Sequence, residues 1–242
     1  MPSPSDNNAQ PLSEHWLYWK DGAHAPDWNM AADETLLQEV SRLGTPILRT
    51  YEWDRKAVSL GYVQHHTAAP EGYAYVRRPT GGGVVYHDFD FTYSVVFPAN
   101  HWLNGLDRIR SYDCLNRSVQ AALRQLGLPV ELAQTEIPHS VERATMVCFT
   151  NPTRYDLLLE ERKIAGSAQR RTAEGLLHQG SLHFGEDGLP FPRTTLATAL
   201  LDGLQTVMGV TCSPFLPDDA LEDKILTLVT EKYGTDAWNQ LR

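Results

Sequence analysis

Cysteine is scarce in this chain: Cys114, Cys148 and Cys212 are the three cysteines among 242 residues. An odd number of widely spaced cysteines, without a Cys-x-x-Cys pair, predicts neither a disulfide framework nor a zinc site. No apolar run approaches the roughly 20 residues of a membrane span. The first ten residues lack the apolar core of a signal peptide. We therefore expect a cytoplasmic protein that does not enter a membrane and holds no metal.

Positive charge is also in short supply. The chain has 21 Lys and Arg against 30 Asp and Glu, a formal net charge of -9. This balance argues against a general role in binding nucleic acid or a membrane surface. A hydrophobic fraction of 42% and a charged fraction of 21% are typical of a globular protein. We expect a disordered tail at residues 1–14 and a single domain at residues 15–242.

Apolar periodicity predicts the elements around which a core can form. Strand patterns occur at residues 16–19, 46–51, 57–61, 73–76, 91–97 and 175–184. Helical spacing occurs at residues 29–43, 109–126, 196–207 and 216–233. This order of elements predicts an α+β fold with a mixed central sheet flanked by helices.

Two further segments carry specific expectations. Large apolar side chains alternate from Phe91 to Phe97, which predicts a strand that is buried on one face and exposed on the other. Residues 136–144 are polar and contain a proline, which predicts a surface loop before Cys148.

A glycine-rich stretch runs from Arg77 to Asp88. It places Gly81, Gly82 and Gly83 between the pair Arg77-Arg78 and the pair His87-Asp88. Glycine lets a backbone approach a ligand closely and present its N–H groups as donors. An adjacent arginine supplies a fixed cation that suits a carboxylate or a phosphate. A glycine-rich hairpin turn would have the same composition, so this run alone is a weak signal.

A second stretch, Lys-Ile-Ala-Gly-Ser-Ala-Gln, occupies residues 163–169. It follows an apolar run at residues 155–159 and a polar break at residues 160–162. This pattern predicts a strand, a tight turn and a second strand that begins near Lys163. The small residues from Ala165 to Ala168 again permit close approach of the backbone to a ligand.

Together these stretches resemble the catalytic domain of the lipoate–biotin protein ligase and transferase superfamily. Its pattern is Arg-Arg-x-x-Gly-Gly, then His-Asp, then Lys-(Ile/Val)-x-Gly-(Ser/Ala)-Ala, and residues 77–88 and 163–168 follow it in order. Residues 29–34, Asn-Met-Ala-Ala-Asp-Glu, are similar to its first-helix signature, although Met30 by itself predicts only core packing. The resemblance implies a fold like that of biotin protein ligase and class II aminoacyl-tRNA synthetases. It also implies an acyl or lipoyl site formed by Arg78, Gly81, Gly82, Gly83, His87, Ala165, Gly166, Ser167 and Ala168.

Cys148 refines this resemblance because it lies 15 positions before Lys163 (163 − 148 = 15). With the intervening Tyr155-Asp156-Leu157, this spacing resembles the monomeric octanoyltransferases of lipoate synthesis. The resemblance implies that octanoyl-acyl carrier protein donates an octanoyl (or lipoyl) group to Cys148. It implies as acceptor a lysine of a lipoyl domain, in a 2-oxoacid dehydrogenase or the glycine cleavage H protein. A thiolate suits this work, and Lys163 would increase the thiolate fraction and donate to the developing oxyanion.

Three interpretations remain open. A cysteine transferase needs no cofactor, but such enzymes often carry Gly-Gly-Arg where this chain has Gly81-Gly82-Gly83. Triple glycine is more common in lipoate-protein ligase A-like enzymes, which use ATP and Mg²⁺, form a lipoyl-adenylate and would leave Cys148 without a role. Against a ligase, the residues after the last family-like strand and helix, about 35, are too few for the accessory core that many ligases carry. Split ligases, however, have that domain on another chain. A pure binding protein is a third reading, but Cys148 and Lys163 argue against it, since a binder needs no nucleophile.

One departure concerns the strand at residues 175–184. The family usually has a His-Gly pair where this chain has His178-Gln179-Gly180. The sequence assigns no function to His178 beyond a place on the face of Leu176 and Leu182.

Overall fold

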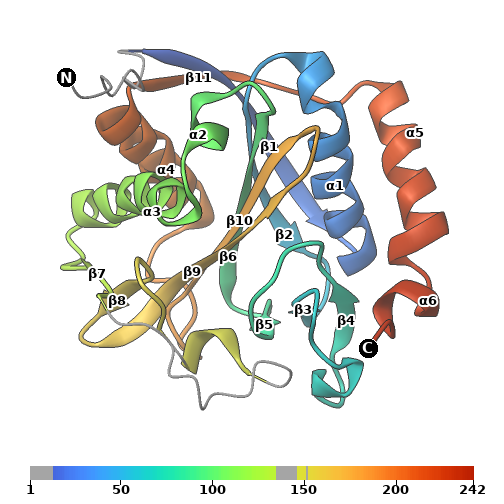
Figure 1. Cartoon of the computed structure of the whole chain (residues 1–242). Helices are drawn as coiled ribbons and strands as arrows, with labels where there is room; N and C mark the ends of the chain where they lie inside the picture. Colours follow the sequence, from blue (N-terminus) through green and yellow to red (C-terminus); the bar gives the residue numbers. More distant parts are fainter. Residues whose placement is uncertain (1–12, 135–145, 151) are drawn as a thin grey trace, which may run out of the picture.

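The computed structural model of the protein describes residues 13–134, 146–150 and 152–242 (Figure 1). Of the predicted N-terminal tail, residues 1–12 lie outside the described residues, and Glu14 already belongs to the first strand. The predicted surface loop at residues 136–144 also lies outside them. In the part of the chain that is described, no helix has the length and apolarity to cross a membrane.

The centre of the fold is an eight-stranded sheet in the order β11-β1-β2-β6-β10-β9-β8-β7. β1 pairs in parallel with β2 and β11, whereas every other neighbouring pair is antiparallel. The strands are β1 (Glu14–His24), β2 (Ile47–Trp53), β6 (Asp90–Pro98), β7 (Glu131–Leu132), β8 (Leu157–Leu159), β9 (Arg162–Arg171), β10 (Gly175–His183) and β11 (Val210–Pro214). The predicted α+β fold with a mixed central sheet is confirmed.

Helices cover both faces of this sheet, with α3 and α4 on one side and α1 and α5 on the other (Figure 1). The longer helices are α1 (Pro26–Leu43), α3 (Arg108–Gln125), α4 (Arg193–Met208) and α5 (Asp219–Leu228). The shorter ones are α2 (Trp102–Gly105), α6 (Asp236–Asn239), a π-helical turn (Val229–Tyr233) and two 3₁₀ turns (His66–Ala68 and Cys148–Thr150). The predicted helices at 29–43 and 109–126 are therefore confirmed, and their ends differ by at most three residues.

The expectation for β6 was wrong in one respect, because all nine of its residues are buried. Phe91, Tyr93, Val95 and Phe97 pack in the core under α3 and α4, as their alternation requires. The opposite face is also covered: Val96 packs with α1, and Ser94 Oγ donates to Asp33 Oδ1 of α1 at 2.7 Å. β6 lies between β2 and β10 in the middle of the sheet, and a middle strand with helices on both sides has no exposed face.

A second, three-stranded sheet carries the glycine-rich stretch. Its central strand β3 (Ala57–Leu60) pairs in parallel with β4 (Ala74–Arg77) and antiparallel with β5 (Val85–Tyr86). The glycines at 81–83 lie in the connection between β4 and β5. This small sheet lies beside β6 and α1 in Figure 1. Gly82 lines the same cavity as Gly166, Ser167 and Ala168 of β9.

The predicted strand, tight turn and strand around Lys163 is also confirmed. β8 and β9 are antiparallel neighbours, and Leu159 pairs with Arg162 across the turn. The two turn residues, Glu160 and Glu161, have φ angles of 51° and 68°. Positive φ at both central positions defines a type I′ hairpin turn, which places Lys163 as the second residue of β9.

Candidate active site

The segment that carries Cys148 is attached to the glycine loop by backbone hydrogen bonds. Val84 N donates to Met146 O at 2.8 Å, and Cys148 N donates to Val84 O at 2.9 Å. A side chain at Gly83 would collide with this segment, since its Cβ would lie 2.8 Å from Cys148 N. Glycine at position 83 therefore allows the cysteine to reach the loop, which is a structural reason for the third glycine.

Cys148 and Lys163, which the spacing predicted to act together, lie side by side. Lys163 Nζ lies 3.5 Å from Cys148 Sγ and donates to Cys148 O at 2.9 Å. The lysine side chain is buried, although a lysine after a polar turn is usually exposed. Burial lowers the pKa of Lys163, but the Cys148 thiolate and the Asp156 carboxylate outweigh it and raise that pKa above its usual value. Lys163 is therefore a cation at neutral pH.

Asp156, to which the sequence assigned no role, is the counter-ion of Lys163. The distance from Lys163 Nζ to Asp156 Oδ2 is 2.7 Å, and both side chains are almost fully buried. The same oxygen accepts from Thr153 N at 2.6 Å and from Thr153 Oγ1 at 2.7 Å. Asp156 could have been suspected as this partner once Lys163 was known to be buried, because a buried lysine needs a partner of opposite charge.

The backbone before Asp156 is held in an uncommon conformation. Tyr155 has a φ of 73°, which is strained for a residue of this size. Asn116 of α3 stabilises it by donating to Tyr155 O at 2.8 Å, and the Asn116 side-chain oxygen accepts from Ser167 Oγ at 3.2 Å. This arrangement links α3, β9 and the carboxylate that faces Lys163.

Gly166 provides the space in which the cysteine and the lysine meet. A Cβ there would lie 2.7 Å from Lys163 Cε, 3.0 Å from Lys163 Nζ and 3.5 Å from Cys148 Sγ.

The glycines of the loop at 81–83 differ in how strictly their positions require glycine. Gly82 has a φ of +95°, which favours glycine, whereas a Cβ at Gly81 would meet nothing within 4 Å.

A cavity of about 430 Å³, including space open to solvent, lies beside Cys148. The predicted ligand residues on its wall are Arg78, Gly82, His87, Gly166, Ser167 and Ala168. Three other predicted ligand residues do not line this cavity: Gly81, Gly83 and Ala165. The carbonyl oxygen of Gly81 accepts from Arg78, and Gly83 contacts the segment that carries Cys148. Ala165 packs in the core. Further wall residues, which the sequence did not single out as ligands, are Met30, Tyr51, Trp53, Ser59, Val85, Thr92, Gln179, Gly180 and Ser181.

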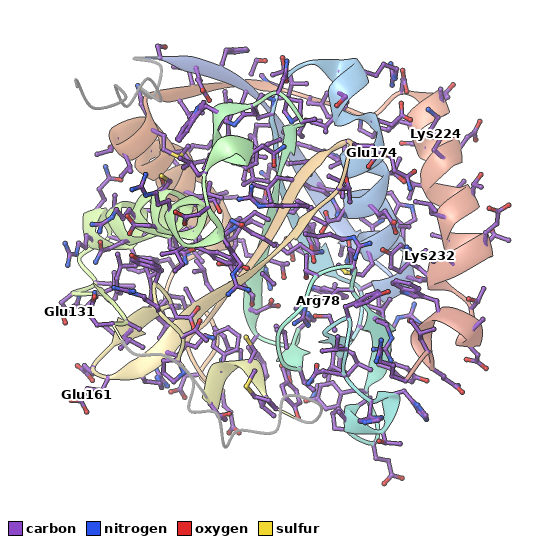
Figure 2. All side chains as sticks on the ribbon, in the orientation of Figure 1. Arg78, Glu131, Glu161, Glu174, Lys224 and Lys232 are labelled. Atoms are coloured by element: carbon purple, nitrogen blue, oxygen red, sulfur yellow. The ribbon has the colours of Figure 1, made fainter. Side chains whose placement is uncertain are left out.

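Arg78 is buried in the interior, whereas Glu131 and Glu161 lie at the margin in Figure 2. Its Nη1 donates to Ser59 O at 2.7 Å, and its Nη2 donates to Gly81 O at 2.6 Å and to Gly83 O at 2.7 Å. These contacts hold the glycine loop from within. Burial lowers the pKa of Arg78 to about 10, which leaves the guanidinium charged at neutral pH.

Arg77, the neighbouring arginine, points away from the cavity. Its guanidinium donates to the backbone carbonyls of Gly61, Gln64 and Asn239 at 2.7 to 3.1 Å. The two arginines of the motif therefore differ: Arg77 fastens the C-terminal segment to the small sheet, and Arg78 supports the glycine loop.

His87 forms a wall of the cavity with both ring nitrogens in use. Nε2 lies 2.8 Å from Ser59 Oγ, Nδ1 lies 2.8 Å from Asp90 Oδ2, and the ring stacks on Trp53. Burial raises the pKa of the Asp90 carboxyl, but His87 and two hydroxyl donors outweigh it and hold the pKa below its usual value. These contacts fix the orientation of the histidine ring on the cavity wall.

Gln179 occupies the position at which the sequence departs from the family pattern. Its Oε1 accepts from Thr80 Oγ1 at 2.7 Å, and its Nε2 donates to Asp33 Oδ2 at 2.7 Å. The same nitrogen lies 3.4 Å from Met30 Sδ. Gln179 therefore joins the approach to the glycine loop to α1, and Met30 belongs to the cavity wall as well as to the core.

A lysine ammonium 3.5 Å from a cysteine sulfur, beside a cavity in a mixed sheet covered by helices, is an arrangement typical of a catalytic domain. Residues 25–204 match the family model described as the lipoyl protein ligase A/B catalytic domain. The chain belongs to this family.

Curated relatives carry the name octanoyltransferase LipM. That of Symbiobacterium thermophilum is 31% identical over 94% of this chain and 99% of its own length. That of Halalkalibacterium halodurans is 29% identical over 93% of this chain and 99% of its own length. That of Moorella thermoacetica is 38% identical over 70% of this chain and 65% of its own length.

Solved structures share the fold. A lipoate-protein ligase A bound with ATP superposes with a TM-score of 0.75 at 22% identity, over 94% of this chain and 98% of that one. The bi-partite lipoate protein ligase of Thermoplasma acidophilum, studied with its E2 lipoyl domain, has a TM-score of 0.72 at 22% identity. It covers 94% of this chain and 96% of its own. At this identity the likeness establishes the fold alone.

Proposed function

We propose that the protein is an octanoyltransferase of protein lipoylation. It takes an octanoyl group from octanoyl-acyl carrier protein onto Cys148 and passes it to a lysine of a lipoyl domain. The observation that carries this proposal is the 3.5 Å distance from Cys148 Sγ to Lys163 Nζ beside a cavity of about 430 Å³. The names of the curated relatives support the same reaction.

In the first step the Cys148 thiolate attacks the carbonyl carbon of the donor thioester. A bond forms between that carbon and Sγ, and the bond to the sulfur of the carrier breaks. The carrier leaves as a thiolate and takes up a proton from water. A thiolate is the nucleophilic form of cysteine, and the new thioester keeps the acyl group reactive.

Lys163 has three N–H groups and three acceptors in the resting site. The three acceptors are Asp156 Oδ2, Cys148 O and, at the longer distance of 3.5 Å, Cys148 Sγ. When Sγ becomes part of a thioester it is a poor acceptor, so the third N–H is released. That N–H then donates to the acyl oxygen as negative charge develops there.

In the second step the neutral amine of the acceptor lysine attacks the Cys148 thioester. A carbon–nitrogen bond forms, the bond to Sγ breaks, and the proton lost by the amine passes to water, which restores the Cys148 thiolate and balances the proton taken from water in the first step. The products are the octanoylated lipoyl domain and the free enzyme, and no nucleotide is consumed.

The alternative is a lipoate-protein ligase that uses ATP and Mg²⁺, which the triple glycine at 81–83 favours. In this site, however, Gly83 has a local function, because it makes room for Cys148. Lys163 would also have to leave Asp156 or Cys148 to serve a phosphate group.

One experiment separates these readings. The purified protein is incubated with an apo lipoyl domain and with octanoyl-acyl carrier protein, free octanoate or free lipoate, each with and without ATP and Mg²⁺. The mass of the lipoyl domain is then measured by mass spectrometry. The proposal predicts octanoylation from octanoyl-acyl carrier protein at equal rates with and without ATP. Modification by free octanoate or lipoate that requires ATP would instead establish the ligase.

A further inference from the structure

We propose that Arg78, rather than Lys163, supplies the net positive charge that favours the Cys148 thiolate, because Asp156 balances the charge of Lys163. This inference rests on the proposed role of Cys148 as the acyl carrier. It divides two tasks between two cations: Lys163 donates a directed hydrogen bond, and Arg78 sets the electrostatic potential of the cavity.

The first part of the case is the pairing of Lys163. Its ammonium lies 2.7 Å from Asp156 Oδ2, and the two side chains are 3% and 4% exposed. A buried pair at this distance acts on its surroundings as a dipole and not as a net charge. Its influence on the ionisation of Cys148 is therefore weaker than that of an unpaired ammonium at the same place.

The second part is the environment of Arg78. Its donors go to the carbonyl oxygens of Ser59, Gly81 and Gly83, with one longer contact of 3.2 Å to Ser59 Oγ. Among residues 13–134, 146–150 and 152–242, no salt bridge to Arg78 occurs. A buried cation without a carboxylate is uncommon, because buried charges are normally paired.

Arg78 and Cys148 also share one site. Both line the same cavity, and Gly83, which accepts from Arg78, directly precedes Val84, whose carbonyl accepts from Cys148 N. Burial lowers the pKa of Arg78, and attraction to a Cys148 thiolate is the largest effect that opposes it. A Cys148 thiolate therefore attracts this guanidinium across the cavity that both residues line, as it also attracts Lys163.

Three tyrosines and two histidines are further titratable groups around the site. His87 is paired with Asp90 on the cavity wall. Burial raises the pKa of Tyr112 to about 12 and also raises the pKa values of Tyr51 and Tyr93, so these hydroxyls stay neutral. The His183 ring lies 5.3 Å from that of Phe149.

The test measures the ionisation of Cys148 directly, through the pH dependence of its alkylation by iodoacetamide. Peptide mass spectrometry of the full-length protein separates Cys148 from Cys114 and Cys212. We expect Arg78→Gln to raise the apparent thiol pKa by about 1 unit or more. Asp156→Asn should lower it by about 1 unit, because the charge of Lys163 is then no longer balanced. A purely structural role of either residue would not produce shifts of opposite sign.

Two further variants separate charge from packing. Arg78→Lys keeps the charge and should leave the thiol pKa near that of the wild type, even if the glycine loop is weakened. Arg77→Gln is the matched control, since Arg77 is also a buried arginine bound to carbonyl oxygens, but its contacts lie away from the cavity. It should leave the thiol pKa unchanged.

An unchanged thiol pKa in Arg78→Gln would overturn the proposal, and so would a raised one in Asp156→Asn. If Arg78→Gln fails to fold, as thermal melting will show, the double change Lys163→Met and Asp156→Asn decides, because it removes the balanced pair together. The proposal predicts a thiol pKa near that of the wild type in this variant, and a clearly raised one would show that Lys163 favours the thiolate. The assay uses no acyl donor. Failure of octanoyl transfer would therefore refute the proposed function without altering the alkylation result.

Discussion

At the residue scale, the geometry of Lys163 makes a specific prediction for its replacement by arginine. The buried ammonium lies 2.7 Å from Asp156 Oδ2 and 2.9 Å from Cys148 O, a compact geometry that a broader planar group does not reproduce. We expect Lys163→Arg and Lys163→Ala to slow single-turnover transfer from octanoyl-acyl carrier protein to a similar degree, about 10²- to 10³-fold. A near-normal rate in Lys163→Arg would mean that the lysine acts only as a positive charge.

Folding needs a control in this pair, because Lys163 is buried against Asp156. Removing one partner of a buried pair typically costs about 3–5 kcal/mol. Asp156 retains two hydrogen bonds from Thr153, which reduces that cost in Lys163→Ala. Thermal melting should show that the variants are folded at the temperature of the transfer assay.

Two glycines offer a matched comparison of space at the site. A Cβ at Gly166 would press on Lys163, whereas a Cβ at Gly81 would meet nothing within 4 Å. We expect Gly166→Ala to reduce the transfer rate at least about 10-fold by displacing the lysine donor. Gly81→Ala should remain within about twofold of the wild type. Equal rates for the two variants would show that the position of the Lys163 side chain does not limit transfer.

The structure changes what we expect from replacing Gly82 with a residue that has a side chain. A side chain at position 82 was expected to harm acyl binding more than stability. Its φ of +95° strains any side chain, and a Cβ would lie 2.8 Å from Arg78 Nη2. Gly82→Val should therefore lower both the melting temperature and the yield of acyl-enzyme.

The sequence predicted the proximity of Cys148 and Lys163, because their spacing and neighbours are local and follow a family pattern. It did not reveal Asp156 as the partner of Lys163, since the burial of that lysine depends on how β8, β9 and α3 pack. The use of Arg78 to hold Gly81 and Gly83 was equally hidden, because those contacts form only when the loop closes around the guanidinium.

At the scale of elements, the β8–β9 turn gives a stability prediction that is separate from catalysis. Glu160 and Glu161 adopt φ angles of 51° and 68°, which asparagine and glycine tolerate better. The double change Glu160→Asn and Glu161→Gly should stabilise the fold by about 0.5–1 kcal/mol and raise the Tm by about 2 °C. Transfer activity should not change. Glu161→Ala is the control and should give no gain, since alanine does not relieve the positive φ.

Elements with long periodic patterns were predicted closely, and short ones that depend on distant partners were not. α3 was expected at 109–126 and spans Arg108–Gln125. α1 begins earlier than expected because Pro26 fits the first turn of a helix. β11 was missed: its five residues pair with β1, as in Val210 with Glu14, and no local pattern indicates such a distant partner.

At the scale of the whole molecule, the buried histidine of β10 predicts how stability changes with pH. Burial lowers the pKa of His178 from 6.5 to about 3. Below pH 6.5 the unfolded chain binds a proton at this residue that the folded protein does not, so stability falls as pH falls from about 6.5 toward 3. Between pH 7 and pH 5 this residue should remove about 2 kcal/mol.

Urea unfolding of the wild type and of His178→Phe at pH 7 and pH 5 measures this contribution. The ring lies in the core between Tyr93 and Tyr112, so phenylalanine suits the site. The loss of stability on acidification should be about 2 kcal/mol smaller in the variant. An identical loss in both proteins would show that His178 is protonated in the folded state.

The whole fold brings the small sheet, the cysteine segment and the β8–β9 hairpin together around one cavity. The central claim is that Cys148 carries the acyl group covalently. Its most direct test is intact-mass spectrometry of the protein after incubation with octanoyl-acyl carrier protein in the absence of ATP. The account predicts one octanoyl adduct, which is lost on treatment with hydroxylamine or on transfer to an apo lipoyl domain. The Cys148→Ala variant should show neither the adduct nor transfer activity. Full transfer by folded Cys148→Ala would contradict it.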